Sequence, residues 1–210
     1  LFQRYAESWK TGNRLTDAFF WQGMSLYRQK KHDEAIGVFS RLATEHAGTA
    51  IAGRALVQSA LCSLAKKDAE DARKTLQAVI RDSRYREVQD EALFELSRSW
   101  LATDQPDMAR VFVNRLSEEF PQSQWTPEAV FRLGEYYFNK GMYESARLHF
   151  NEMVSRWAGN PLAGDALYWI GWTYAREGRT AMALGIFRSF TEKYPDNEYG
   201  GDARMRIAAM

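Results

Sequence analysis

The chain has 210 residues, of which 45% are hydrophobic and 26% are charged, and its formal net charge is +1. This composition is typical of a folded protein and excludes collagen-like or linker-like material, while the small net charge argues against a general attraction to nucleic acid. The single cysteine excludes an internal disulfide framework, and no apolar stretch reaches the roughly 18 residues that a membrane span needs.

A fixed period of 37 residues runs through the sequence. Six alanines lie 37 residues apart: Ala18, Ala55, Ala92, Ala129, Ala166 and Ala203. The same step separates a column of small residues, which are Gly23, Ala60, Ser97, Gly134, Gly171 and Ala208. It also separates a column of bulky residues, which are Phe39, Leu76, Val113, Phe150 and Phe187. A sustained period of this length indicates stacked structural repeats.

Within a repeat, the apolar residues follow the spacing of two amphipathic helices. In the fifth repeat, Ile170 and Tyr174 fall on one helical face, and Ala183 and Phe187 fall on a second. Gly178 separates the two faces, and glycine adopts the positive φ that ends many helices. Each repeat is therefore predicted to be an antiparallel helix hairpin.

In chain order, residues 1–10 are predicted to be the second helix of a preceding repeat, because Phe2 and Tyr5 lie 37 residues before Phe39 and Leu42. Five full repeats follow at 16–52, 53–89, 90–126, 127–163 and 164–200. Residues 201–210 are predicted to begin a sixth repeat. The whole chain is thus predicted to be one fragment of a longer array, with its further repeats or domains outside the sequence.

Two kinds of helix cap are predicted from the sequence. Thr126 precedes Pro127 and Glu128, which is the order expected for an N-cap, a first helical residue and an acid in the first turn. Acids recur at one position of the repeat and are expected to cap the N-termini of the first helices. They are Asp17, Glu91, Asp165 and Asp202.

The repeats resemble the tetratricopeptide repeat family. The fifth repeat carries the fullest set of signature residues, which are Leu167, Ile170, Gly171, Tyr174, Ala183, Phe187, Phe190 and Pro195. The second repeat departs most, with Ser63 in place of an aromatic residue and Arg84 in place of the closing proline. The resemblance implies an all-α fold, a right-handed α–α superhelix of helix hairpins whose first helices line a concave wall.

The resemblance also implies a role in binding another protein or peptide. The 37-residue period and the links between hairpins are similar to those of bacterial cell-envelope members, such as the Tol-Pal-associated coordinator and the outer-membrane assembly lipoprotein D. A periplasmic or outer-membrane-associated location is therefore expected, and the cytoplasm stays open. Two other readings remain: a non-catalytic arm of a larger enzyme such as a lytic transglycosylase, and a self-assembling structural array.

Candidate partner contacts are the residues of the first helices that lie outside the family signature. Aromatic and apolar side chains with a few charges recur there, as expected for a surface with apolar anchors and polar selectivity. The candidates are Phe20, Met24, Tyr27, Phe94, Arg98, Phe131, Glu135, Phe138, Tyr168, Trp172 and Arg176. For several of the rings, packing between hairpins is the competing explanation. Alternatively, the concave wall contacts a second copy of the chain or segments of the same protein that lie outside this sequence.

The sequence carries no motif for catalysis, a cofactor or a metal. His32, His46 and His149 lack the spacing that places two ligands on one helical face, and Cys62 is interpreted as a small core residue. The short basic stretch around Tyr85 is interpreted as a solvated link and not as a nucleic-acid contact. No direct membrane insertion of these residues is expected.

Overall fold

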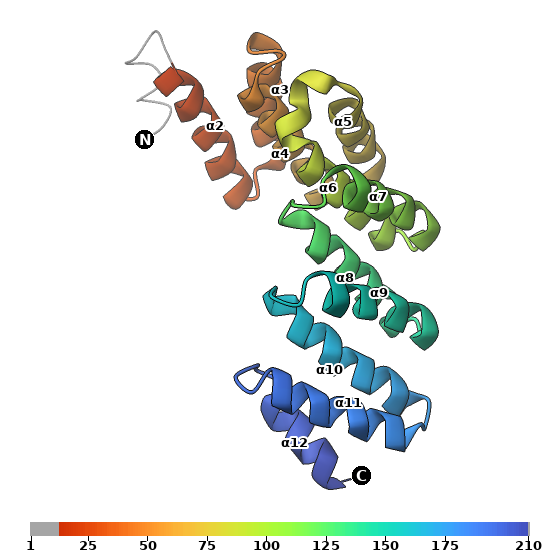
Figure 1. Cartoon of the computed structure of the whole chain (residues 1–210). Helices are drawn as coiled ribbons and strands as arrows, with labels where there is room; N and C mark the ends of the chain where they lie inside the picture. Colours follow the sequence, from red (N-terminus) through yellow and green to blue (C-terminus); the bar gives the residue numbers. More distant parts are fainter. Residues whose placement is uncertain (1–12, 210) are drawn as a thin grey trace. The chain divides into compact units, whose positions relative to one another are not determined.

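The computed structural model describes residues 13–209, and within that range all regular secondary structure is helical (Figure 1). The predicted all-α class is therefore confirmed. The chain divides into two compact units at Thr103 and Asp104, and each unit is described by itself. The helix predicted for residues 1–10 lies outside the described residues.

The N-terminal unit is a series of consecutive helices, each packed against the next. Three-residue turns separate α2 from α3 and α4 from α5, which gives two helix hairpins. The elements are α2 (Asn13–Arg28), α3 (His32–Glu45), α4 (Ala50–Ala65), α5 (Ala69–Arg81), the 3₁₀-helix η1 (Ser83–Val88) and α6 (Gln89–Ala102).

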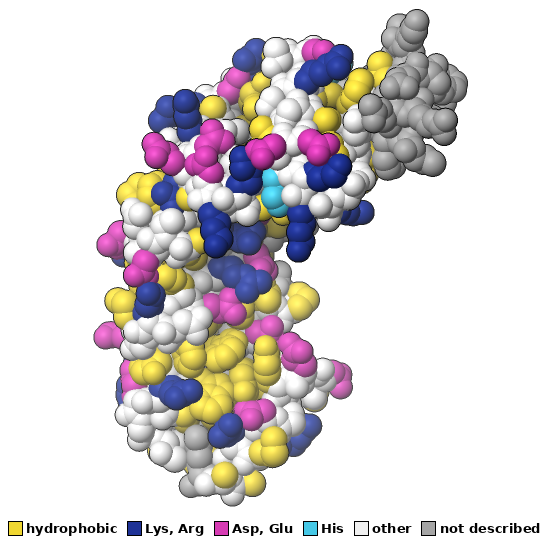
Figure 2. Space-filling view, turned by 180° about the vertical axis from the view of Figure 1, so that it is seen from behind, with side chains coloured by type: hydrophobic (Ala, Val, Ile, Leu, Met, Phe, Trp, Pro, Cys, Tyr) yellow, Lys and Arg dark blue, Asp and Glu magenta, His cyan; other side chains and the backbone are white. Residues whose placement is uncertain are grey.

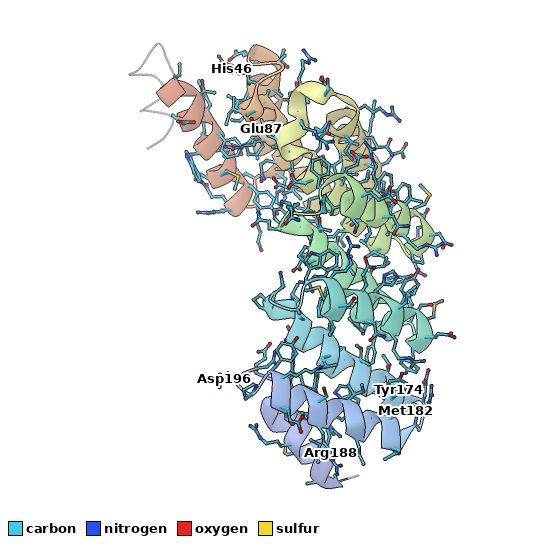
Figure 3. The ribbon with its side chains drawn as sticks, viewed as in Figure 1. His46, Glu87, Tyr174, Met182, Arg188 and Asp196 are labelled. Carbon is cyan, nitrogen blue, oxygen red and sulfur yellow. The ribbon has the colours of Figure 1, made fainter. Side chains whose placement is uncertain are left out.

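The C-terminal unit continues the same pattern. Helices α8 and α9 form one hairpin, α10 and α11 form the next, and α9 packs against α10 (Figure 1). The elements are α7 (Pro106–Glu119), α8 (Trp125–Asn139), α9 (Tyr143–Arg156), α10 (Pro161–Arg176), α11 (Thr180–Lys193) and α12 (Gly200–Ala209). In Figure 3, Tyr174 and Met182 lie near the turn that joins α10 to α11, and Asp196 lies at the opposite end of α11.

The first helix of each repeat begins a few residues before the predicted repeat boundary. The predicted boundaries are residues 16, 53, 90, 127 and 164, whereas the helices begin at Asn13, Ala50, Gln89, Trp125 and Pro161. The prediction of Thr126 as an N-cap is wrong for the same reason, because α8 already begins at Trp125. The buried Thr126 hydroxyl instead donates to the carbonyl oxygen of Phe120 at 2.7 Å and so fixes the preceding link to the helix.

The two helices of a hairpin approach most closely where a small residue faces a bulky one. A Cβ atom added to Gly134 would lie 2.7 Å from the ring of Phe150, and one added to Gly171 would lie 2.6 Å from the ring of Phe187. Gly23 faces Phe39 in the same way. Such distances are far below normal van der Waals separation, so only glycine admits the phenylalanine ring here.

The sizes of the two columns are matched from repeat to repeat. The three repeats with phenylalanine in the bulky column have glycine in the small column. In the second repeat the bulky residue is Leu76 and the small residue is Ala60; in the third they are Val113 and Ser97. Where the residue of the bulky column is smaller, the residue of the small column is larger, so the combined volume stays roughly constant from repeat to repeat, as close packing requires.

The turns inside the hairpins share a left-handed residue at one position of the repeat. The residues with positive φ there are Lys30, Lys67, Asp104, Gly141 and Gly178, at φ values between 62° and 73°. At Gly141 the backbone N–H donates to Phe138 and the next N–H donates to Tyr137, which satisfies carbonyls at the helix end as in a Schellman motif. The same pair of hydrogen bonds recurs at Lys30, Lys67 and Gly178.

The link after α5 contains the extra helix η1, which the sequence did not predict. Tyr85 is buried there, and its hydroxyl accepts a hydrogen bond from the backbone N–H of Gly48 at 3.2 Å. The side chain of Gln89 donates to the carbonyl oxygens of Ile80 and Asp82, both at 3.0 Å. The arginines of this basic stretch are exposed, as expected for a link, but Tyr85 anchors the segment to the preceding one.

We predict that Gly134→Ala lowers the free energy of unfolding by about 1–3 kcal/mol, because the added methyl group overpacks the contact with Phe150. Phe150→Leu in the same chain should recover part of this loss, because the second repeat already combines alanine with leucine at the equivalent positions. A double-mutant cycle measured by urea denaturation gives the coupling energy.

Gly185→Ala is the matched control for this cycle. Gly185 lies within α11, is exposed, and has no atom within 4 Å of an added Cβ. Alanine should therefore stabilise the helix there by about 0.5–1 kcal/mol. If the changes in unfolding free energy caused by Gly134→Ala and Phe150→Leu were strictly additive in the double variant, the size-matching interpretation would be contradicted.

We further predict opposite effects of substitutions at the shared turn position. Gly178→Ala should lower the unfolding free energy by about 1–2 kcal/mol, because a Cβ atom is unfavourable in the left-handed conformation. Lys67→Gly should raise it by up to about 1 kcal/mol, since relief of this strain exceeds the entropic cost of glycine. Thermal and urea denaturation measure both changes, and equal signs for the two would refute the prediction.

Candidate functional site

Tyr168 is the centre of an aromatic cluster in the C-terminal unit. Its side chain is only 5% exposed, and its ring stacks on that of Tyr199 with centroids 4.5 Å apart. The rings of Phe187 and Phe190 on α11 lie 5.8 and 5.5 Å away. The Tyr168 hydroxyl donates to Oδ2 of Asp202 on α12 at 2.6 Å. Tyr168 therefore connects α10 to α11 and to the start of α12.

Larger rings beside Tyr168 are partly exposed. Trp169 lies 4.9 Å from the ring of Phe138 on α8. Trp172, one turn further along α10, has the guanidinium of Arg206 at 4.5 Å and that of Arg176 at 5.6 Å from its ring centroid. Both distances fall within the range of cation–π attraction. These two indole rings leave apolar surface accessible on the unit.

We call the four partly exposed rings of this region the aromatic face; they are Phe138, Trp169, Trp172 and Tyr199. Trp169 lies between two of the others, because its ring is 4.9 Å from Phe138 and 6.3 Å from Tyr199. In the lower part of Figure 2, where the C-terminal unit is drawn, apolar side chains gather in one patch with acidic and basic side chains around it.

Three of the predicted contact residues are buried. Phe94 is 4% exposed, Phe131 is 3% exposed, and the ring of Phe131 lies 5.6 Å from that of Phe150. Tyr168 belongs to the same column of the repeat. These side chains fill space inside their units, as the competing packing explanation holds, and little of them is left to contact a partner.

The predicted residues of the N-terminal unit are mostly engaged by their own unit. Phe20, Met24 and Tyr27 are partly buried against the core that contains Phe39, and Tyr27 lies 5.4 Å from the ring of His32. These contacts make the three side chains part of the packing of the first hairpin.

Arg98 is exposed but is held in place by neighbours on its own helix. Its Nη1 lies 2.9 Å from Oε1 of Glu95, and its guanidinium lies 5.5 Å from the ring centroid of Phe94. Burial raises the pKa of the Glu95 carboxyl, while the charge of Arg98 opposes that shift. Arg98 therefore has a local role as the counter-ion of a buried acid.

Four predicted residues lie at the aromatic face: Glu135, Phe138, Trp172 and Arg176. Glu135 is partly exposed and pairs with Nη1 of Arg132 at 2.8 Å. The sequence interpretation missed Trp169, Tyr199 and Arg206. Trp169 and Arg206 occupy one column of the repeat, whose members are Trp21, Gln58, Glu95, Arg132, Trp169 and Arg206. Because the residue types in that column differ so much, the comparison of columns did not single it out.

The acids predicted to cap helices have different roles. Asp202 does lie in the first turn of α12, and Glu91 lies in the first turn of α6. The prediction is wrong for Asp17 and Asp165, since neither lies in the first turn of its helix. Asp165 instead accepts a hydrogen bond from Nδ2 of Asn197 at 2.7 Å, which ties α10 to the link that precedes α12.

The groups considered for catalysis or metal binding are embedded in the packing. Burial raises the pKa of the Cys62 thiol to about 11, which disfavours the reactive thiolate. His149 is buried and stacks on Tyr137 at 5.6 Å, and burial lowers the pKa of its imidazole. Among residues 13–209, no three or more His, Cys, Asp or Glu side chains are grouped as metal ligands would be. No helix in the described range is long and apolar enough to cross a bilayer.

The consecutive helix hairpins and the recurring small and bulky columns define an α-helical repeat protein. The tetratricopeptide repeat-like domain family matches residues 3–163, and the tetratricopeptide repeat itself matches residues 165–197. The chain therefore belongs to the tetratricopeptide repeat family. No curated protein matches the sequence.

Several solved structures share the fold. YrrB, described as a TPR protein with an unusual peptide-binding site, is 18% identical over 97% of this chain and 97% of its own, with a TM-score of 0.55. MamA is 18% identical over 85% of this chain and 91% of its own, with a TM-score of 0.59.

The C-terminal part of a TPR repeat-containing protein from Cytophaga hutchinsonii also has this fold. It is 16% identical over 84% of this chain and 65% of its own, with a TM-score of 0.63. At these identities the likeness concerns the fold alone.

We predict that Tyr168→Phe lowers the free energy of unfolding by about 1–2 kcal/mol at neutral pH, because it removes the hydrogen bond to Asp202. Burial and that hydrogen bond raise the pKa of Tyr168 to about 12, above the value of about 10 in an unfolded chain. Its contribution to stability is therefore complete below about pH 10 and is lost as the pH rises towards 12.

Urea denaturation between neutral and alkaline pH measures this effect. The difference in stability between the parent and Tyr168→Phe should shrink above about pH 10. A difference that stayed constant across the alkaline range would show that the ionisation of Tyr168 is not linked to folding.

Proposed function

We propose that the chain is a protein-interaction scaffold that binds a peptide or protein segment on the aromatic face of its C-terminal unit. The observation that carries this proposal is the run of partly exposed rings across α8, α10 and the link before α12. Exposed clusters of large apolar side chains commonly mark interaction surfaces, and tryptophan and tyrosine are enriched among the residues that dominate binding energy.

The support beneath the aromatic face suits it to binding. Tyr168 is buried between Tyr199 and the rings of α11, and its hydroxyl is held by Asp202. Rings that are already fixed by such packing lose little conformational entropy when a partner binds. The face therefore offers preorganised apolar anchors with Glu135, Arg176 and Arg206 around them.

The comparison with YrrB supports the same function, because that protein shares the fold and is described as having a peptide-binding site. The location proposed for this chain is the bacterial cell envelope, on the similarity of its 37-residue period and links to envelope members of the family. Fractionation of cells that produce the full-length protein tests the location.

The binding proposal is tested by selecting twelve-residue peptides from a random phage-displayed library on the immobilised chain. The selected peptides are then made synthetically, and their dissociation constants are measured by fluorescence anisotropy. Trp169→Ala and Trp172→Ala should each weaken binding by roughly tenfold or more, which is the scale expected for a central aromatic anchor.

Leu148→Ala and Met182→Ala serve as controls, because these side chains are 66% and 48% exposed and lie on α9 and α11, which contribute no ring to the aromatic face. Both controls should bind the peptides like the parent chain. Selected peptides whose binding depended on Leu148 or Met182 and not on either tryptophan would overturn the proposal, as would a failure to select any peptide.

A further inference from the structure

The aromatic face has one corner in which rings and carboxylates come from the same three elements. The rings are Phe138 on α8, Trp169 on α10 and Tyr199 in the link before α12. All three side chains are partly exposed. We call these three rings, together with Glu135, Asp165 and Glu198 from the same elements, the acidic corner.

Three carboxylates belong to the same elements as the rings of the acidic corner: Glu135 on α8, Asp165 on α10 and Glu198 in the link. Asp165 on α10 is fixed near the link by its hydrogen bond with Asn197, two residues before Tyr199. Glu198 directly precedes Tyr199, and Glu135 lies three residues before Phe138, on the same side of α8. Consistently, burial and then the negative charges of Glu198, Asp165 and Glu135 raise the pKa of Tyr199. The acids and rings of the acidic corner thus share one small region of the surface.

The positive charges nearby do not balance these acids. Arg132 pairs with Glu135 at 2.8 Å, but it also pairs with Glu128 at 2.7 Å, so its charge is shared between two carboxylates. Asp165 is bonded to an uncharged amide. The guanidinium of Arg204 on α12 lies near Gly200, the residue after Tyr199. Two arginines thus stand against the carboxylates of Glu128, Glu135, Asp165 and Glu198, so the acidic corner keeps an excess of negative charge.

The opposite end of the aromatic face differs in charge. Arg206 and Arg176 approach the ring of Trp172, and Arg206 also pairs with Asp202 at 3.4 Å. Asp165 and Arg176 lie eleven residues apart on α10, which corresponds to about 16 Å along the helix axis. A partner segment of about five extended residues spans that distance, so its two ends meet surfaces of opposite charge.

Rings next to uncompensated carboxylates favour a cation. The faces of aromatic rings attract ammonium and guanidinium groups, and neighbouring carboxylates add charge-assisted hydrogen bonds. An acidic side chain in the same place would lose contacts with water and meet negative charge. We therefore propose that the partner segment places a lysine or arginine side chain in the acidic corner, next to the apolar residues that contact Trp169 and Trp172. This inference rests on the proposed function.

The composition of the peptides selected from the phage library tests the inference directly. Peptides selected on the parent chain should be enriched in lysine or arginine beside apolar residues. For a selected synthetic peptide, replacing its basic residue by glutamine should weaken binding about threefold or more, and replacing it by glutamate should weaken binding by roughly tenfold or more.

The variant Glu135→Gln/Asp165→Asn/Glu198→Gln removes the three carboxylates and should abolish the difference between the lysine and glutamate peptides. The control variant Glu118→Gln/Glu144→Gln/Glu192→Gln changes the net charge equally at exposed positions of the same unit and should keep that difference. Circular dichroism spectra and unfolding curves verify that both variants are folded.

The outcomes separate the two proposals. Peptides that require Trp169 or Trp172 but show no preference for a basic residue would overturn the charge inference and leave the proposed function standing. A preference for lysine that survived in the triple carboxylate variant would also overturn it. Loss of the preference only in that variant, with binding still dependent on the tryptophans, is the result that we expect.

Discussion

The close approach of two helices within each hairpin is the constraint on which the structure depends. Where Gly134 faces Phe150, and where Gly171 faces Phe187, the ring occupies the space that a Cβ atom would need. Helix axes approach this closely only where one side chain is absent or very small. The recurrence of the same arrangement at a 37-residue step makes successive hairpins alike and allows them to stack.

This arrangement determines where the remaining large side chains of a first helix lie. In α10, the face with Gly171 and Tyr168 packs against the rings of α11, and Trp169 is directed instead towards Phe138 on α8 and Tyr199 in the link before α12. Trp172 lies at the edge, with the ring of Phe187 at 6.2 Å and the guanidinium of Arg206 at 4.5 Å. Tyr168 is buried by the link before α12, whereas the two tryptophans are covered only in part. The aromatic face is thus a by-product of hairpin packing that is available for recognition.

The period, the helix hairpins and the small and bulky columns could all be predicted from the sequence. Close packing restricts the size of the residue at each packed position, and the same restriction recurs in every repeat. Helix starts were less predictable: Thr126 has the right neighbours for a cap, yet its hydroxyl bonds to the link. Column comparison did not single out Trp169, which shares its column with Gln58, Glu95 and Arg132, or Tyr199, whose column of apolar residues such as Val88 and Leu162 has the pattern of a packing position. Nor could sequence tell Phe131 and Phe138 apart, since burial depends on the neighbouring helix.

The residue type at the shared left-handed turn position differs between the two units, and this difference should affect how readily the hairpins open locally. Lys30 and Lys67 hold a left-handed conformation in the N-terminal unit, whereas Gly141 and Gly178 adopt it in the C-terminal unit at little steric cost. A difference of about 1 kcal/mol at one turn changes the population of a locally opened state about fivefold. Amide hydrogens next to the lysine turns should therefore exchange with solvent sooner, and the hairpins beside the aromatic face should be the slower ones to open.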